Sequence, residues 1–489
     1  MRGGRQKVMS KSLKKNTFFN IIKTCSSILF PLITFPYVSR VLLPDNVGKV
    51  NFAVSFVNYF ALIASLGVQT YAIRECAAVN SDKKKLNNIS SQIFSINLCM
   101  TVIAYISLLV TLIFARKLDA YRTLIVIQSS TILFTTLGAD WLNSAMEDFK
   151  FITIRTISFQ LISLIAMFAL VHKPNDYVKY AIINVVSSSG ANIANMWYRK
   201  RYCDVKFTLH IDWKRHMIPI SLLFVMTLSQ TIFHNADITM LGLMWDDYQV
   251  GLYSTAHKLT NLVSTVVQSV ILVVMPRLSY YFARDDWDNA NKLLRKLLLL
   301  NIGLGLPCVT GVIMLAKDIV WIVGGDEFAG AASVIQILIL GFMFTLVGGS
   351  FLGNAILIPT KNEKYYMIVC CVTAIANVIF NAVLIPFLAA IGAAIATAFN
   401  ALIILVLLLL KVDKRLSIER KLNIFLGPIL GCAGICVCCL LSGLISYIWF
   451  RVLVSIISSI FVYVFILKLC NNDFVKEVLG ILNAKTHRN

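Results

Sequence analysis

Charged side chains are scarce in this chain of 489 residues: they make up 14% of it, against about 25% in an ordinary soluble protein. Apolar residues make up 58% instead. A soluble fold of this length needs more polar surface than these residues supply. The same composition excludes intrinsic disorder and a secreted disulfide scaffold. The sequence therefore predicts a polytopic membrane protein of the all-α class.

Other absences narrow the function. No G-x-x-x-x-G-K-[ST] loop occurs, and no link between apolar runs is long enough for a soluble catalytic domain, so we expect neither ATP hydrolysis nor any enzyme activity. Most of the 12 cysteines fall inside apolar runs, where they act as small hydrophobic side chains. Cys436 and Cys439 form a C-x-x-C without nearby His or acidic ligands. We therefore expect no metal site and no cofactor.

Fourteen apolar runs are long enough to cross about 30 Å of hydrocarbon, which takes roughly 20 residues of helix. The run 178–198 is rich in Asn and Ser and spans a membrane only if that face meets protein or water. The first run is too long for a signal peptide, so we expect it to be retained. The runs lie near residues 16–38, 51–73, 92–114, 123–140, 152–171, 178–198, 217–243, 256–276, 297–320, 332–358, 366–387, 389–410, 424–447 and 450–469.

Positive charge is distributed unevenly over the links. When residues near the ends of the runs are counted with the adjacent links, 34 of the 45 Lys and Arg residues lie on the side of the amino terminus and 10 on the opposite side, which leaves only Lys23 inside a span. Because basic residues are retained on the cytoplasmic side, the bias predicts that both termini are cytoplasmic. The net charge of +21 is thus a sign of topology, and we expect no nucleic-acid partner.

Short internal matches indicate a repeat. Residues 47–53 resemble residues 250–256 at an offset of 203, and the same offset relates Arg74 to Arg277. A shift of six spans preserves orientation, which predicts two parallel six-helix repeats with a substrate path between them. The expected organisation is a basic amino-terminal segment (1–15), a first lobe (16–198), a basic link (199–216), a second lobe (217–410), an extra helix pair (411–469) and a cytoplasmic tail (470–489).

Four cations are candidates to bind an anionic group in a cavity. Lys23, inside the first span, either lines an inward cavity or snorkels to the headgroups. Arg74 and Arg277 end corresponding spans of the two repeats. There they either bind phosphate, which suits the planar guanidinium, or serve as ordinary positive-inside charge. Lys258 lies at the start of the eighth span, where it either anchors the helix at the membrane interface or contacts the substrate.

Three further ionisable residues are candidates for ion coupling or ion pairing. His234 and Asp237 are three residues apart and share one face of the seventh span. Asp237 lies too deep to snorkel easily, so it is either a proton-coupling carboxylate or the partner of a cation such as Lys258. Asp140, near the inner end of the fourth span, is the third candidate.

Uncharged polar groups inside the spans have two readings. The Ser, Thr and Asn residues of the fourth and sixth spans, with Gln128, Asn377 and Asn381, either hydrogen-bond sugar hydroxyls or join helices to one another. Glu147 and Asp148 follow the fourth span and are expected to be link contacts.

Four motifs together resemble the polysaccharide repeat-unit flippases of the multidrug/oligosaccharidyl-lipid/polysaccharide exporter superfamily. The resemblance covers roughly residues 10–410. It departs from the family at residues 143–145, Asn-Ser-Ala, where Phe-Gln-Gly is often found. The motifs are residues 237–242 with 250–258, residues 38–44 with 47–48, Trp141-Leu142 with residues 147–150, and residues 324–328.

This resemblance implies a two-lobed helical transporter in the bacterial inner membrane. Its substrate would be an undecaprenyl-pyrophosphate-linked oligosaccharide, of O-antigen or capsule type, carried from the cytoplasmic to the periplasmic leaflet by alternating access. It also implies contact with membrane lipid, and a polymerase and a chain-length regulator as partners. The alternatives are a drug or cation exporter of the same superfamily and a lipid II flippase.

Overall fold

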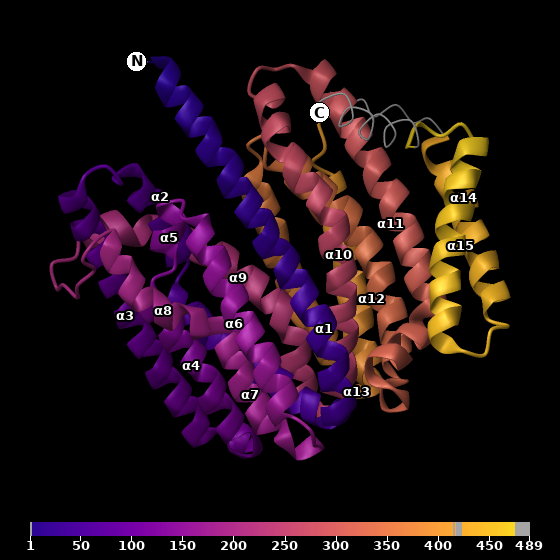
Figure 1. Cartoon of the computed structure of the whole chain (residues 1–489), viewed down its shortest axis with the longest axis horizontal. Coiled ribbons are helices and arrows are strands. Elements are labelled where there is room, and N and C mark those ends of the chain that lie inside the picture. Colours follow the sequence, from indigo (N-terminus) through magenta and orange to yellow (C-terminus); the bar gives the residue numbers. More distant parts are fainter. Residues whose placement is uncertain (1, 414–415, 417–422, 475–489) are drawn as a thin grey trace. The chain divides into compact units, whose positions relative to one another are not determined.

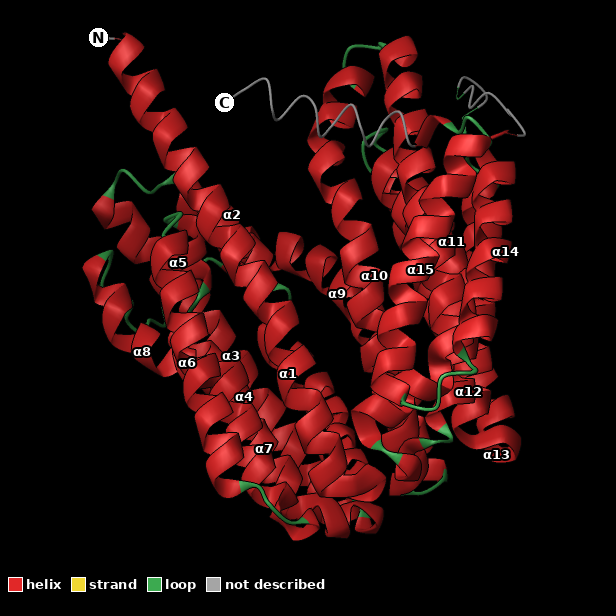
Figure 2. Ribbon diagram, turned by 45° about the vertical axis from the view of Figure 1, so that its right-hand side comes forward, coloured by secondary structure: helices red, strands yellow, loops and turns green. Residues whose placement is uncertain are grey.

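The computed structural model describes residues 2–413, 416 and 423–474, and within these ranges every regular element is helical (Figure 2). Nine helices of this part are long and apolar enough to cross a membrane. A tenth, α10 (Asp247–Phe282), passes the same test with a bend of 49° between Ser269 and Val274. The all-α, polytopic fold predicted from the sequence is confirmed. The predicted link 411–421 and tail 470–489 lie largely outside the described residues.

The first two predicted spans form one helical run that folds back on itself. This run, α1 (Arg2–Ser65), is broken at Leu43, where φ is 65°. At about 1.5 Å per residue, a straight helix would separate Lys23 from Asn58 by about 50 Å. Both residues line a single cavity, so the chain reverses its direction at Leu43.

A second reversal joins the eleventh and twelfth predicted spans within α13 (Glu363–Leu409). Its break lies at Ala389, where φ is 48°. The two halves then run side by side, and the Tyr365 hydroxyl donates to the Leu407 carbonyl at 2.7 Å. At each reversal only one residue lies outside helical torsion angles, so the chain turns there without a loop.

Each remaining predicted span falls on one helix or on helices that continue one another (Figure 1). In chain order these are α2 (Val68–Ala78), which extends the second span, α3 (Lys83–Phe114), α4 (Arg122–Gly138), α6 (Phe149–Leu170), α7 (Tyr177–Val185) with α8 (Ala191–Tyr198), α9 (Trp213–Met244), α10, α11 (Trp287–Gly324), α12 (Ala331–Thr345) with η6 (Leu346–Leu357), α14 (Asn423–Ser442) and α15 (Ile448–Leu469).

Residue contacts divide the chain into two compact units, Met1–Gly251 and Leu252–Asn489. In the first unit α1 packs against α3, α4, α6 and α9, and the short helix α5 (Trp141–Ala145) packs against α2. A buried cluster that includes Tyr71, Ile93 and Leu142 fills the space between α2, α3 and α5. These units describe packing, and the lobe boundaries derived from the repeat stay a prediction.

In the second unit, α12 packs on α13, and the extra helices α14 and α15 pack on each other and on α11. Two ion pairs connect α15 and the residues directly after it to α11. Arg451 of α15 pairs with Asp318, and Arg295 pairs with Asp473 at 2.9 Å. Since Asp318 and Arg295 lie near opposite ends of α11, the pair is held along the length of that helix.

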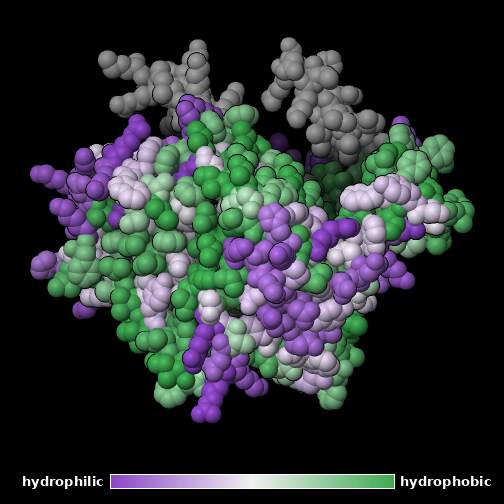
Figure 3. Space-filling model, turned by 60° about the horizontal axis from the view of Figure 1, so that its bottom comes forward, coloured by the Kyte–Doolittle hydropathy of each residue, from purple (hydrophilic) through white to green (hydrophobic). Residues whose placement is uncertain are grey.

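The exterior carries large apolar side chains along the predicted spans. Leu109, Ile113, Ile165, Phe461 and Phe465 are all exposed. Figure 3 shows one face of the molecule, on which hydrophobic residues form broad areas and hydrophilic residues gather in separate clusters. Helices satisfy their own backbone polar groups, so such a surface is suited to lipid.

Two glycines of the predicted repeat contact each other's helix ends reciprocally. A Cβ on Gly48 would lie 1.9 Å from the Asp247 carbonyl oxygen, and a Cβ on Gly251 would lie 2.1 Å from that of Pro44. The repeat offset relates Gly48 to Gly251 and Pro44 to Asp247. Reciprocal contact is what a two-fold relation between repeats produces. The complete repeat layout stays a prediction.

Replacing Gly48 with alanine is expected to destabilise the protein, because the new methyl group meets backbone atoms that cannot rotate away. We expect a loss of about 1–3 kcal/mol, the usual range for overpacking. Thermal unfolding of the purified protein in detergent would measure it. Gly311→Ala is the matched control, since no heavy atom lies within 4 Å of the position that its methyl group would take. Equal unfolding temperatures for Gly48→Ala and the wild type would contradict the contact.

Candidate functional site

A cavity of about 810 Å³ lies inside the first unit. Its walls come from α1, α2, α3, α4, α5, α6, α7, α8 and α9. Because these helices expose apolar side chains on the outside, the polar residues they contain collect around the cavity. The fold thus encloses a polar space within an apolar protein.

Most polar groups of the wall are uncharged. The helix α4 contributes Gln128, Thr131 and Thr135, and the sixth predicted span contributes Asn184, Ser188 and Asn192. Amides and hydroxyls both donate and accept hydrogen bonds. The wall therefore suits a ligand with many hydroxyl groups.

The sixth predicted span, 178–198, can cross a membrane only if its polar face meets protein or water, and in the structure it does. Its middle, η3 (Val186–Gly190), is a π-helical turn whose serines line the cavity. Further along, the Asn195 side chain is buried and donates to the Gly138 carbonyl at 2.6 Å, while Asn143 donates to the Asn195 amide oxygen. The polar face of this span thus meets the cavity and protein groups.

Three of the seven predicted site residues line this cavity. They are Lys23 from α1, Asp140 from the turn between α4 and α5, and His234 from α9. Asp237 is not part of the lining, although it lies on the same helix, and its exposed fraction is 1%. The structure thus brings together an ammonium, a carboxylate and an imidazole from three distant segments of the chain.

Arg155 of α6 is a strongly buried cation of the wall that sequence analysis did not select. Its side chain is 4% exposed, and its Nη2 donates to Asp140 Oδ1. Its Cζ lies 5.5 Å from the centroid of the Phe151 ring. The 34 basic residues counted on the amino-terminal side include this arginine. The signal that could have found it is its position inside the apolar run 152–171.

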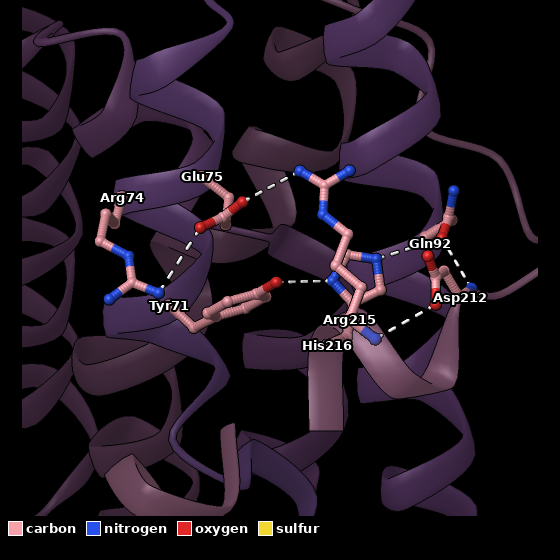
Figure 4. Close-up of polar contacts among 7 residues, drawn as sticks. All are labelled: Tyr71, Arg74, Glu75, Gln92, Asp212, Arg215 and His216. Atoms are coloured by element: carbon pink, nitrogen blue, oxygen red, sulfur yellow. Dashed lines mark hydrogen bonds and ion pairs between the residues drawn. The ribbon is translucent and has the colours of Figure 1, made fainter. Parts of the chain in front are cut away.

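Arg74 does not line the cavity. Its side chain is 63% exposed, lies 3.5 Å from the Glu75 carboxylate and covers one face of the Tyr71 ring (Figure 4). The same carboxylate pairs with Arg215 of α9 at 3.2 Å. Arg74 is therefore one member of a charged surface cluster that joins α2 to α9.

A buried histidine lies beneath this cluster. The Nδ1 of His216 lies 2.7 Å from the Tyr71 hydroxyl, and its Nε2 lies 3.1 Å from Gln92 Oε1 (Figure 4). An amide oxygen only accepts, so Nε2 carries the hydrogen and Nδ1 accepts from Tyr71. Through this ring α2, α3 and α9 are joined at one point.

The remaining two predicted cations belong to α10 in the second unit. Lys258 is half-buried, whereas Arg277 is exposed and donates from Nε to the Tyr281 hydroxyl at 3.1 Å. Asn377 and Asn381 are buried on the first half of α13, where one amide donates to the other at 3.2 Å. A second cavity of about 590 Å³ in this unit contains none of the predicted site residues. Across the described residues, no group of three His, Cys, Asp or Glu side chains is placed to hold a metal ion.

Asp148 caps the first turn of α6. Its carboxylate accepts from the Phe151 backbone amide at 3.2 Å and from the hydroxyls of Tyr198 and Tyr202. Burial opposes ionisation, but the hydrogen bonds from Tyr202 and Tyr198 outweigh it and hold the pKa of Asp148 below its usual value. The motif that contains Asp148 thus orders the link between α5 and α6.

Comparison with known sequences identifies relatives along most of the chain. It matches the family described as Polysaccharide biosynthesis protein over residues 13–282 and the family described as MatE over residues 223–383. A protein of Shigella dysenteriae named as an O-antigen transporter is 24% identical over 409 residues, which cover 82% of this chain and 100% of that protein. The capsular polysaccharide biosynthesis protein CapF of Staphylococcus aureus is 23% identical and covers 80% of this chain and 97% of its own.

Solved structures with the same fold are membrane transporters. The inward closed conformation of the lipid II flippase MurJ superposes with a TM-score of 0.75 at 16% identity, over 94% of this chain and 100% of that one. An inward-facing multidrug resistance transporter of the MATE family gives 0.60 at 14% identity, over 78% and 93%. At these identities the likeness concerns the fold, and it agrees with the polytopic all-α architecture.

Replacing Asp148 with asparagine is expected to lower stability at pH 7 by about 1 kcal/mol, because the hydroxyls of Tyr198 and Tyr202 then donate to a neutral amide oxygen in place of a carboxylate. A carboxylate whose folded-state pKa is lowered stabilises the protein above its unfolded pKa of about 3.9 and loses that effect as pH falls through the folded value. The difference in unfolding temperature between wild type and Asp148→Asn should therefore be constant from about pH 7 to pH 5 and shrink below about pH 4. A difference that persists unchanged at about pH 3 would contradict this role.

Proposed function

Because this chain belongs to the family of polysaccharide biosynthesis proteins in the multidrug/oligosaccharidyl-lipid/polysaccharide exporter superfamily, we propose that it is a flippase for undecaprenyl-pyrophosphate-linked oligosaccharides. The substrate is a repeat unit of an O-antigen or a capsule, moved from the cytoplasmic to the periplasmic leaflet of the bacterial inner membrane. The observation that carries the proposal is the polar cavity of the first unit, enclosed by helices with an apolar exterior.

The chemistry of the cavity fits both parts of such a head group. Hydroxyl-rich sugars need many groups that donate and accept, which α4 and the sixth span supply through Gln128, Thr131 and Asn184. A pyrophosphate needs cations, which Lys23 and Arg155 supply. The lipid tail stays in the bilayer, so it needs no place in the cavity. Arg74, Lys258 and Arg277 are proposed as further contacts along the path.

The names of the relatives support this class of substrate. One is named as an O-antigen transporter, another as a capsular polysaccharide biosynthesis protein, and a third, of Haloferax volcanii, as a low-salt glycan biosynthesis flippase that is 26% identical over 168 residues, or 34% of each chain. A polymerase and a chain-length regulator are the proposed partners, since a repeat unit delivered to the outer leaflet must then be joined to others.

The proposed direction follows from charge. With 34 basic residues on the amino-terminal side and 10 opposite, both termini are cytoplasmic. Alternating access would then open the polar path first to the cytoplasm and next to the periplasm. The proposed energy source is an ion gradient, with His234 and Asp237 of α9 as proton sites.

The cavity also bears on the rival substrates. A cationic drug needs carboxylates, but Asp140 is paired with Arg155 and the other ionisable groups of the wall are Lys23 and His234. This balance favours an anion over a cation. Lipid II is anionic too, so the substrate assay has to separate it from a polysaccharide precursor.

We expect cells that lack this protein, but keep the neighbouring sugar-assembly enzymes, to accumulate lipid-linked oligosaccharide on the cytoplasmic leaflet and to lose surface polysaccharide. The wild-type chain should restore the surface polymer, and Lys23→Ala at equal abundance should restore at most about a tenth of it, since one cation of the path is missing. Lys85→Ala is the control, because this exposed lysine lies outside the cavity. Normal surface polysaccharide in the deleted cells would contradict the function, and drug efflux and lipid II flipping would be assayed instead.

The proposed coupling to an ion gradient can be tested separately from the substrate. If a proton gradient drives transport, collapsing it with an ionophore should slow flipping in proteoliposomes that contain the purified protein. Asp237→Asn should flip slowly with or without the gradient, because the amide cannot take up a proton. Flipping by the wild type that is unchanged by the ionophore would show that protons are not the coupling ion.

A further inference from the structure

We propose that Arg155 and Trp141 form the phosphate-binding subsite of the first-unit cavity, and that Asp140 occupies part of this subsite when no substrate is bound. The ligand class is a phosphoryl or diphosphate oxyanion. The inference rests on the proposed function for the identity of that ligand, the pyrophosphate of a lipid-linked sugar. The residues themselves are assigned from the structure.

The cavity wall leaves one kind of hydrogen-bonding group without a partner. Among the described residues that line the cavity, three buried side-chain atoms have no hydrogen-bond partner: Nε and Nη1 of Arg155 and Nε1 of Trp141. All three are N–H donors, and no buried acceptor of this lining is left without a partner in the described part of the chain. Buried polar groups in proteins are nearly always paired, so three unpaired donors at one cavity call for acceptor groups on a ligand.

The cavity wall carries more positive than negative charge. The Arg155 side chain is 4% exposed and carries a positively charged guanidinium. Its ionic partner is Asp140, whose own side chain is 28% exposed. With Lys23 on the same wall, cations outnumber carboxylates there. A neutral acceptor would leave this excess of positive charge on the wall, whereas phosphate oxygens both accept hydrogen bonds and neutralise it.

The Arg155 guanidinium is held in one orientation. The guanidinium lies over the Phe151 ring, with Cζ 5.5 Å from the ring centroid, and is fixed at Nη2 by Asp140. Its plane is therefore set before any ligand arrives, and its remaining donors form part of the planar fork that binds phosphate in bidentate fashion. Trp141 directly follows Asp140 in the chain and begins α5, so both ends of the subsite are positioned by one turn of the chain.

Asp140 gives the subsite an internal competitor. Its carboxylate presents an anionic oxygen to Nη2 of Arg155, as a phosphate would. An incoming oxyanion must share the guanidinium with it or replace it. Asp140 therefore weakens binding and promotes release, so removing its charge is expected to have opposite effects on affinity and on transport.

The binding experiment uses the full-length protein in lipid nanodiscs, with inorganic pyrophosphate as the probe in isothermal titration calorimetry. We expect Asp140→Asn to bind more tightly than wild type and the pair Asp140→Asn/Arg155→Gln to bind about tenfold more weakly or worse, the usual consequence of losing a charged hydrogen bond. Trp141→Phe, which keeps a ring and loses the N–H, should bind a fewfold more weakly. The matched control is Asp119→Asn/Arg122→Gln, an exposed ion pair of the same unit at 3.0 Å, and it should bind like wild type.

The outcomes separate the subsite from the function. Wild-type affinity in the Asp140→Asn/Arg155→Gln protein, or equal weakening in the control, would overturn the subsite. If that variant fails to fold, Arg155→Lys serves instead, because it keeps the charge and loses the fork, and full affinity in it would overturn the subsite as well. Pyrophosphate that competes with lipid-linked oligosaccharide in a flipping assay identifies a lipid headgroup as the natural ligand. Pyrophosphate binding that needs Arg155, in a wild-type protein that flips no such lipid, would refute the flippase proposal and leave a site for free phosphate.

Discussion

The interior of a bilayer offers no water, so every polar group of this chain must find a partner within the protein, reach an interface or surround a water-filled space. This constraint organises the structure. Many Ser and Thr side chains donate back to carbonyls of their own helix, as Ser39 and Thr373 do to Phe35 and Val369. In the first unit, many of the remaining polar groups line the cavity. Others, such as Asn377 and Asn381, are buried between helices of the second unit.

Much of the fold could be predicted because this constraint acts on sequence directly. Apolar runs of spanning length mark the helices, and the structure places a helical segment at each of them. The sequence alone does not show that the two reversals are breaks within one helical run, because a single residue, Leu43 or Ala389, changes the direction of the chain. Hydropathy measures the length of a span and says little about how one span turns into the next.

The candidate site was predictable only in part, because side chains that meet in space come from distant helices. Lys23 and His234 were selected as ionisable residues inside spans, and both line the cavity. Arg155 was not selected, since its partner Asp140 is 15 residues away, beyond any helical period. Arg74 was selected for its place in a repeat, but Glu75 and Tyr71 engage it at the surface. One-dimensional patterns identify which residues are costly in a membrane, and only packing decides which of them share a space.

The ion pair between Asp318 of α11 and Arg451 of α15 has a consequence for the order in which the protein is made. The two residues are 133 positions apart, so the carboxylate leaves the ribosome well before the guanidinium exists. At about 5–20 residues per second, the interval is roughly 7–27 seconds. During this time α11 must reside in or near the membrane with a carboxylate whose final partner has not been synthesised. Completion of this part of the fold is therefore tied to the insertion of α15, the last helix of spanning length in the described residues.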